Sequence, residues 1–386
     1  MSIFEKTPAL RWAVPAVTAV ALVGGGSAIG GLHASAGSGL LARSAAQLLV
    51  DVQQARLDGL SGTVVQKSDL GLPTLPVAGD SGGTASSDLT SLISGTHTMR
   101  VWFAGPDKVR MALLGTMAES DVIRNGADVW VYASKSKTAK HYVMPTYDAA
   151  GKSKATSGLP GATDLPTSHQ AAAEKALAAI SQGTKVTTSG TAWVAGRRAY
   201  ELVLTPKEAT SLVAQVRVAI DGTEHVPLRV QVFAKKVADP VFEVGFSVVA
   251  FARPDAAQFV FKPPPGTVVT DAKKPAGDKT RAKTVAPQPK SADMPKVIGK
   301  GWGSVMVVKM PAASAKAGTS SNTGATTDKT VAQLMKFVGL LPKRSGDWGS
   351  GHLMEGKGFS ALLTDDGRLV VGAVTPKGLY AALAAK

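Results

Sequence analysis

The sequence predicts an α+β chain in which one large antiparallel β-sheet is followed by a small second unit. Apolar and polar side chains alternate along most of residues 96–261, and turn-forming residues separate the alternating runs. A stretch rich in Lys, Pro and Ala then divides this region from the last part of the chain. With 386 residues, of which 44% are hydrophobic, the chain can form a sizeable core. A wholly disordered chain is thereby excluded.

Residues 1–36 have the pattern of an export signal. Lys6 and Arg11 precede an uncharged apolar run at 12–23, and Ala34-Ser35-Ala36 fits a cleavage site. If the glycine-rich residues after the apolar run are added, the segment is long enough for an uncleaved signal-anchor that crosses the membrane. Both alternatives place the rest of the chain outside the cytoplasm, either secreted or held at the cell membrane.

The exported region is predicted to begin with a helix and a β-meander. Apolar residues recur at spacings of three and four across 39–57, which predicts an amphipathic helix, and a strand begins at Ser61. Residues 74–94 are predicted to be a polar loop. The turns Gly105-Pro106-Asp107 and Asn125-Gly126 then indicate hairpins. The strands of this meander are predicted at 99–103, 109–114, 120–124, 128–133 and 140–144.

A second run of strands follows another low-complexity loop at 147–167. Ser168 caps a predicted helix at 169–180, and alternation resumes at Arg198. The sequence TPKE at 205–208 predicts a short helix, because it combines a capping box with proline at the first helical position. The remaining strands are predicted at 216–220, 228–232, 242–250 and 259–261.

Residues 269–300 are predicted to be a linker and residues 301–386 a small α+β domain. The linker is rich in Lys, Pro and Ala, so it is either a solvated spacer or a basic segment that meets anionic head groups. In the small domain we expect a helix at 331–341 and a hairpin at Asp365-Asp366-Gly367. A last helix is expected to begin at Pro376.

The composition and the motifs argue against several kinds of chemistry. The chain has no Cys, which excludes disulfides, thiol catalysis and lipidation of an N-terminal Cys. The string GDSGG around Ser81 resembles a hydrolase motif, but low-complexity sequence flanks it where a strand and a helix are needed. The six His are scattered without metal-ligand spacing. We therefore predict no enzymatic activity, no cofactor and no metal.

The formal net charge of +15 predicts an anionic partner. For an exported protein, a membrane surface fits this charge better than nucleic acid does. Aromatic residues make up only 5% of the chain and lie on the predicted strand faces rather than among the basic residues. We therefore predict contact with a membrane surface and no binding of nucleic acid.

Most predicted strands have an apolar face, and few helices are available to cover them. One interpretation is a closed barrel or sandwich packed by its own side chains, and the other is a curved sheet whose apolar face encloses a ligand. Alternation assigns residues to a face but does not say which face is concave. It also leaves open whether Trp130 and Tyr132 or Val129 and Val131 point inward.

Several segments, in this order and spacing, resemble the LolA-like superfamily of exported proteins. The superfamily includes the LolA lipoprotein carrier, LppX/LprG-type lipid binders and RseB-type sigma-E regulatory proteins. The resemblance covers about residues 40–268, and no single segment is diagnostic. The segments are GLSG at 59–62, the hairpin at 99–114 with its turn GPDKVR, IRNGADVWVY at 123–132, GRRAYEL at 196–202, VAID at 218–221, VPLRV at 226–230 and FVFKPPPG at 259–266.

The resemblance implies that residues 40–268 form a half-open, mostly antiparallel β-barrel with lid helices at 39–57 and 169–180. It implies a non-enzymatic carrier that holds lipids or the acyl chains of lipoproteins or glycolipids. The alternative is an RseB-like regulator that binds a membrane protein, such as an anti-sigma factor or a transporter, and senses lipidated ligands. RseB-type members have a second C-terminal domain, whose place residues 301–386 take here. The residues expected to contact acyl chains are apolar and lie on alternating strands: Val101, Phe103, Met111, Leu113, Leu202, Val218, Val230, Val244, Phe246 and Val248.

Overall fold

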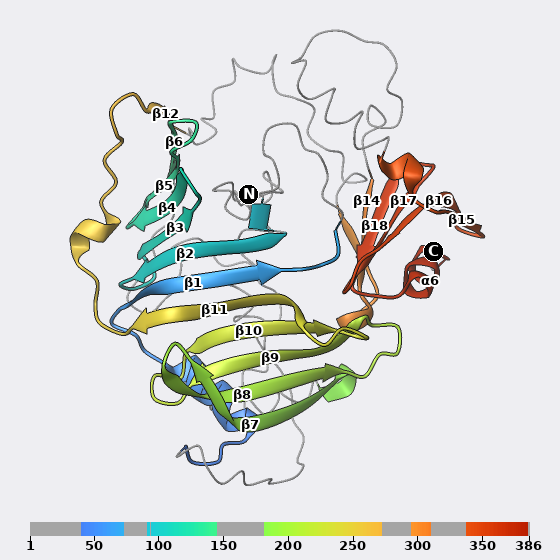
Figure 1. Ribbon diagram of the computed structural model, residues 1–386, viewed down its shortest axis with the longest axis horizontal. Helices are drawn as coiled ribbons and strands as arrows, with labels where there is room; N and C mark the ends of the chain where they lie inside the picture. Colours follow the sequence, from blue (N-terminus) through green and yellow to red (C-terminus); the bar gives the residue numbers. More distant parts are fainter. Residues whose placement is uncertain are drawn as a thin grey trace, which may run out of the picture.

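The computed structural model describes residues 40–72, 91–92, 94–144, 181–271, 295–309 and 337–384. These residues form mostly β-structure, arranged as a twelve-stranded sheet and a six-stranded sheet with few helices (Figure 1). The expected α+β class is thus strongly shifted toward β in the described part of the chain.

The twelve-stranded sheet consists of two antiparallel meanders that meet at its centre. Its strands are β1 (Leu60–Ser68), β2 (Gly95–Phe103), β3 (Lys108–Leu114), β4 (Glu119–Asn125), β5 (Asp128–Ala133), β6 (Thr138–Val143), β7 (Thr184–Val194), β8 (Arg197–Pro206), β9 (Val213–Asp221), β10 (Pro227–Ala234), β11 (Pro240–Ala250) and β12 (Val268–Asp271). Strands β2 to β6 follow β1 in order on one side, and β11 to β7 follow in reverse order on the other. β12 pairs in parallel with β6 at one edge.

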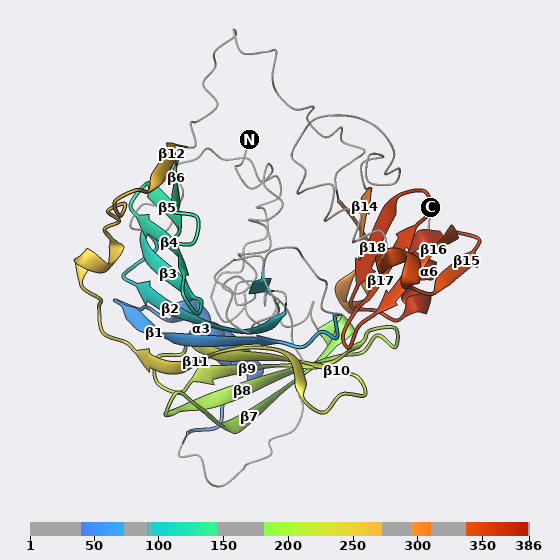
Figure 2. The same ribbon diagram turned by 45° about the horizontal axis from the view of Figure 1, so that its top comes forward.

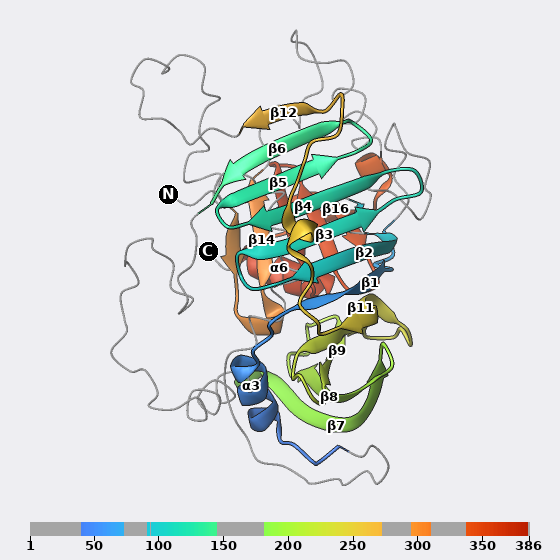
Figure 3. The ribbon, with the colours of Figure 1, turned by 90° about the vertical axis from the view of Figure 1, so that its left-hand side faces the viewer.

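The large sheet is strongly curved and open. Figure 2 shows β2 to β6 rising as a wall beside a floor formed by β1 and β11 to β7. Helix α3 (Ala45–Gln54) lies on the concave side of this sheet. The short 3-10 helix η3 (Ala256–Phe259) crosses the convex side over β3 and β4 (Figure 3). Because the edge strands β12 and β7 do not pair with each other, the sheet is not a closed barrel.

Helix α3 forms where apolar residues recur at helical spacing behind a capping residue. Ser44 Oγ accepts a hydrogen bond from Gln47 N at 3.2 Å, and Gln47 Oε1 accepts one from Ser44 N at 2.9 Å. This capping box satisfies two backbone donors that the first turn would otherwise leave unpaired. Leu48 is fully buried against the sheet residues Tyr200, Leu202, Leu204 and Ile220.

The six-stranded sheet has its own apolar core. Its strands are β13 (Lys296–Ile298), β14 (Val305–Lys309), β15 (Lys343–Gly346), β16 (Gly349–Glu355), β17 (Ser360–Thr364) and β18 (Arg368–Gly372), in the spatial order β13-β14-β18-β17-β16-β15. Helix α6 (Pro376–Ala384) contacts β14, β17 and β18. The buried core consists of Val305, Leu353, Leu362, Val370, Val374 and Leu379.

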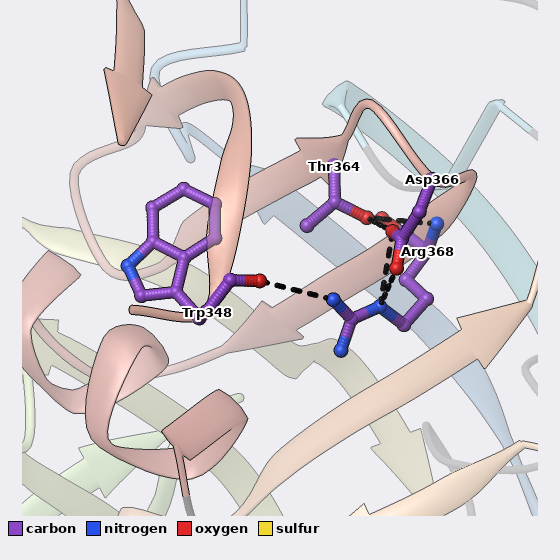
Figure 4. Close-up of polar contacts among 4 residues, drawn as sticks. All are labelled: Trp348, Thr364, Asp366 and Arg368. Atoms are coloured by element: carbon purple, nitrogen blue, oxygen red, sulfur yellow. Dashed lines mark hydrogen bonds and ion pairs between the residues drawn. The ribbon is translucent and has the colours of Figure 1, made fainter. Parts of the chain in front are cut away.

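Polar contacts close the predicted hairpin between β17 and β18 (Figure 4). Thr364 Oγ1 accepts a hydrogen bond from Arg368 N at 2.9 Å. Arg368 Nε donates to Asp366 Oδ1 at 3.0 Å, and its Nη2 donates to Trp348 O at 3.2 Å. Arg368 therefore ties the turn at 365–367 to the turn of the neighbouring β15–β16 hairpin.

The small sheet is attached to one end of the large sheet by specific contacts. Thr375 N donates to Thr210 O at 2.8 Å. Trp302 Nε1 donates to Thr184 Oγ1 at 2.8 Å, and its ring packs against the same apolar cluster as α3. Lys357 also forms an ion pair with Asp69. The contacts between the two sheets thus include directional hydrogen bonds, an ion pair and an aromatic side chain.

Two local predictions are wrong, and several strands were not predicted. No helix forms at 205–208, because β8 extends to Pro206 and Lys207 N donates to Gly183 O at 2.9 Å. Residues 256–259 form η3 in place of the strand predicted at 259–261. The unpredicted strands are β7, β12, β13, β15 and β16. At 205–208, pairing with β7 outweighs the local preference for a single helical turn, because such a turn is costly to nucleate.

Several predictions concern residues outside the described ranges. They are the export signal at 1–36, most of the loop at 74–94, the loop at 147–167, the helix at 169–180 and most of the linker at 269–300. The helix expected at 331–341 is described only from residue 337, and residues 337–340 are helical. Among the described residues, no helix is both long and apolar enough to cross a membrane.

Candidate functional site

Cross-strand register identifies one continuous apolar face on the large sheet. Residues paired across an antiparallel sheet lie on the same face. Met99 on β2 pairs with Val64 on β1 and with Leu113 on β3. Val64 in turn pairs with Phe246 on β11. These residues form a cluster with Leu92, Val101, Met111 and Val244.

The same face continues across the other half of the sheet. Val244 on β11 pairs with Val230 on β10, and Val230 pairs with Val218 on β9. Val218 pairs with Leu202 on β8, which packs against α3. Since α3 lies on the concave side, the continuous apolar face is the concave one (Figure 2). The structure thus resolves the question that alternation left open.

Nine of the ten residues expected to contact acyl chains lie on this concave face. Leu113 and Leu202 are fully buried. The other seven are half-buried: Val101, Phe103, Met111, Val218, Val230, Val244 and Phe246. Helix α3 packs over the end that contains Leu202 and Val218, whereas the cluster around Met99 contains no residue of α3. Helix α3 therefore covers one end of the face.

Val248 does not share this face, so its inclusion with Val244 and Phe246 is wrong. A β-bulge interrupts the pairing of β1 with β11: Val64 pairs with Phe246, but Thr63 pairs with Val248. The extra residue, Ser247, reverses the alternation, and Val248 is 63% exposed on the convex side. A strict period of two cannot predict such an insertion.

The choice between the valines and the aromatic residues of β5 is also resolved. Val131 pairs with Val122, which pairs with Met111, so Val131 and the neighbouring Val129 belong to the concave face. Trp130 and Tyr132 lie on the convex face, where both rings contact Phe261, with ring centroids 5.1 and 5.4 Å away.

The convex face carries ion pairs. Arg110 Nε lies 3.0 Å from Asp121 Oδ1, and the guanidinium groups of Arg100 and Arg110 flank the Trp102 ring at 5.5 and 5.1 Å. Burial and the nearby carboxylate of Asp121 raise the pKa of Glu119. These charges are separated by the sheet itself from the apolar residues opposite.

Two polar residues on the concave face were missed from the sequence. Gln66 and His97 pair directly across β1 and β2, and both are almost fully buried. The alternation itself carried this signal. Gln66 lies two residues from Val64 on β1, and His97 lies two residues from Met99 on β2, so each polar residue shares a face with an apolar one. A polar residue at an inward position of an apolar strand is an unusual choice that indicates a specific hydrogen-bonding role.

The described residues contain no group of three or more His, Asp or Glu that could hold a metal ion. Ser81, in the hydrolase-like string, lies outside the described ranges. What the concave face offers chemically is extended apolar contact, with the polar pair Gln66 and His97 buried within it.

Comparison with protein families gives one match. Residues 81–271 match the family described as predicted periplasmic protein (DUF2092). This description agrees with the extracytoplasmic location predicted from the export signal. No curated protein matches the chain in sequence.

Several solved structures are similar to the chain. A chain of the MucA/MucB complex of Pseudomonas aeruginosa has 14% identity and a TM-score of 0.40, covering 87% of this chain and 94% of that one. A LolA superfamily protein from Nitrosomonas europaea has 10% identity and a TM-score of 0.19, and the match covers 57% of this chain and 99% of that one. A conserved protein from Thermus thermophilus has 11% identity and a TM-score of 0.33, and the match covers 58% of this chain and 96% of that one.

Proposed function

We propose that this protein is an extracytoplasmic, non-enzymatic binding protein that holds acyl chains on the concave face of its large sheet. The observation that carries the proposal is the continuous apolar face from β3 to β8, of which α3 covers one end. Most of the apolar side chains on this face are only half-buried on an open curved sheet. An apolar ligand that removes them from water therefore forms a stabilised complex with the protein.

The magnitude of apolar burial is sufficient for tight and reversible binding. Each buried CH₂ group contributes about 0.8 kcal/mol, so a chain of about sixteen carbons contributes roughly 12 kcal/mol before costs. Ordering the acyl chain and moving any protein segment that covers the face reduce this binding energy by several kcal/mol. We propose α3 and the helix predicted at 169–180 as the segments that move when a lipid enters.

A matched pair of variants on one strand tests the proposal. Val244→Glu places a carboxylate on the concave face, whereas Val248→Glu places the same group on the exposed convex side of β11. We expect Val244→Glu to weaken binding of a fluorescent acyl probe about tenfold or more, because a buried carboxylate is costly to desolvate. Val248→Glu should bind as the wild type does.

Mass spectrometry of the natively purified protein provides an independent measurement. We expect an acyl-containing lipid to be released from the wild type on organic extraction. If no lipid is released, and the probe binds the wild type and both variants equally, the acyl-binding proposal is wrong.

The regulator alternative is favoured by one observation, the second sheet attached to the end of the first through Thr375 and Trp302. A regulator needs a protein partner in the membrane, whereas a carrier needs a transferable lipid. Pull-down from membranes, followed by mass spectrometry of the lipid and the protein fractions, distinguishes the two. A stoichiometric membrane protein without lipid would favour the regulator.

A further inference from the structure

Two polar side chains are buried within the apolar concave face. Gln66 is 2% exposed and His97 is 4% exposed, and the two residues are paired across β1 and β2. Gln66 also pairs with Val244 on β11, and Met99 follows His97 at the next inward position of β2. The polar pair therefore lies directly beside the side chains proposed to contact acyl groups.

Each of the two side chains uses one polar atom to hold the backbone that leads into β2. Gln66 Nε2 donates to Leu92 O at 3.0 Å. His97 Nε2 lies 2.8 Å from Ser94 O, and because a carbonyl oxygen can only accept, Nε2 carries the proton. In the neutral ring His97 Nδ1 is then an acceptor.

The second polar atom of each side chain has no hydrogen-bond partner. Both Gln66 Oε1 and His97 Nδ1 are buried and unpaired. Buried polar groups in native proteins are nearly always paired, and an unpaired acceptor loses its hydration without compensation. Two such acceptors from cross-strand neighbours define a site for a group with two hydrogen-bond donors.

We propose that Gln66 Oε1 and His97 Nδ1 receive the head group of the bound amphiphile, an uncharged group with two O–H or N–H donors next to its acyl chain. This inference rests on the proposed acyl-binding function. A glycerol or sugar ester has such donors, whereas an ionised carboxylate has none and would face two acceptors. The site thus discriminates between amphiphiles by donor count, which the apolar face cannot do.

Two probes of equal chain length test this inference with the full-length protein. Monopalmitoylglycerol has two free hydroxyls, and methyl palmitate retains the ester and the chain but has no donor. Displacement of a fluorescent acyl probe measures the affinity of each. Because two recovered hydrogen bonds together correspond to about a tenfold gain, we expect the wild type to bind monopalmitoylglycerol about tenfold more tightly.

Substitutions assign this preference to the two residues. In Gln66→Leu with His97→Leu, we expect both probes to bind with equal affinity. Gln231→Leu is the matched control, since Gln231 donates to Glu243 on the convex face and its loss should leave the preference unchanged. A preference that persists in the double variant would assign the head group elsewhere and overturn the inference.

Labelled histidine gives a second readout that does not depend on how the variants fold. In the wild type, the ¹⁵N resonance of His97 Nδ1 should shift with monopalmitoylglycerol and not with methyl palmitate. Identical spectra, or equal affinities of the wild type for both probes, would overturn this inference and leave the acyl-binding function standing. If neither probe binds, the proposed function itself fails.

Discussion

His141 illustrates how a single side chain can fasten one segment of this protein to another. Its Nε2 lies 2.8 Å from Asp128 Oδ1 on β5, and its Nδ1 lies 3.1 Å from Asp271 Oδ1 on β12. The ring also stacks on Trp130 with centroids 4.3 Å apart. β12 adds four residue pairs in parallel to β6, and the contact between His141 and Asp271 adds a side-chain link to this edge strand.

The contacts of His141 predict a pH dependence of the edge strand. Burial lowers the pKa of His141, but the hydrogen bonds and charges of Asp128 and Asp271 together outweigh it and raise the pKa above 6.5. The stabilisation is therefore complete below the unfolded pKa and is lost as the pH rises through the raised folded pKa. We expect amide hydrogen exchange in β12 to become less protected across that interval, after correction for intrinsic exchange.

Asp271→Asn provides the control for this pH dependence. It keeps the shape of the side chain but removes one of the two charges beside His141, so the pH dependence of protection in β12 should become weaker. A protection profile that is identical in the wild type and in Asp271→Asn would contradict this assignment.

Among the elements, α3 has the clearest division of roles between its cap and its apolar stripe. The capping box at Ser44 and Gln47 begins the helix, and Leu48 attaches it to the concave face. A helix of ten residues is marginal in water without such contacts, so both are needed to keep α3 in place.

We expect Ser44→Ala to destabilise α3 by about 1 kcal/mol, the usual cost of losing an N-cap. Hydrogen exchange of the Leu48 amide, which donates to Ser44 O at 3.0 Å, measures this local change. Ser44→Asp retains an acceptor for the Gln47 amide and should exchange like the wild type. Equal protection in Ser44→Ala and the wild type would show that packing alone determines the helix.

For the molecule as a whole, Trp302 is one of the residues that attach the small sheet to the large one. Its indole N–H bonds to Thr184, which is 4% exposed, and its ring contacts the cluster beneath α3. The small sheet, the large sheet and α3 therefore meet around one side chain.

Trp302→Ala should lower the free energy of unfolding by about 3 kcal/mol, because it removes an aromatic side chain from a packed site and leaves Thr184 without its donor. Trp193→Ala is the matched control: Trp193 is 61% exposed, and its loss should cost less than about 1 kcal/mol. Calorimetry of the two variants provides the measurement. An equal loss of stability in both would contradict a specific role for Trp302.

The local pattern of the sequence was sufficient for much of the sheet and for part of the candidate site. The meander from β2 to β6 follows from period-two alternation, and its turns follow from Gly105 and Gly126, whose φ angles are 101° and 64°. The hairpin of β17 and β18 was predicted on the same grounds. Both rest on interactions between residues close in sequence, which a local pattern contains.

Contacts between distant residues could not be predicted in this way. β1 pairs with β11 across more than 170 residues of sequence, and the bulge within that pairing moves Val248 to the convex side. The curvature that makes one face concave, and the burial of Gln66 beside His97, likewise depend on how the two meanders meet.

The sequence by itself therefore determined the alternating strands, their turns, the LolA-like resemblance and which apolar residues could share a face. The tertiary structure decided which of the two faces is concave and on which face of the sheet Val248 lies. It also decided which polar atoms are left unpaired within the concave face. The physical reason is range: alternation and turns depend on neighbours along the chain, whereas register, curvature and burial depend on segments that only the folded sheet brings together.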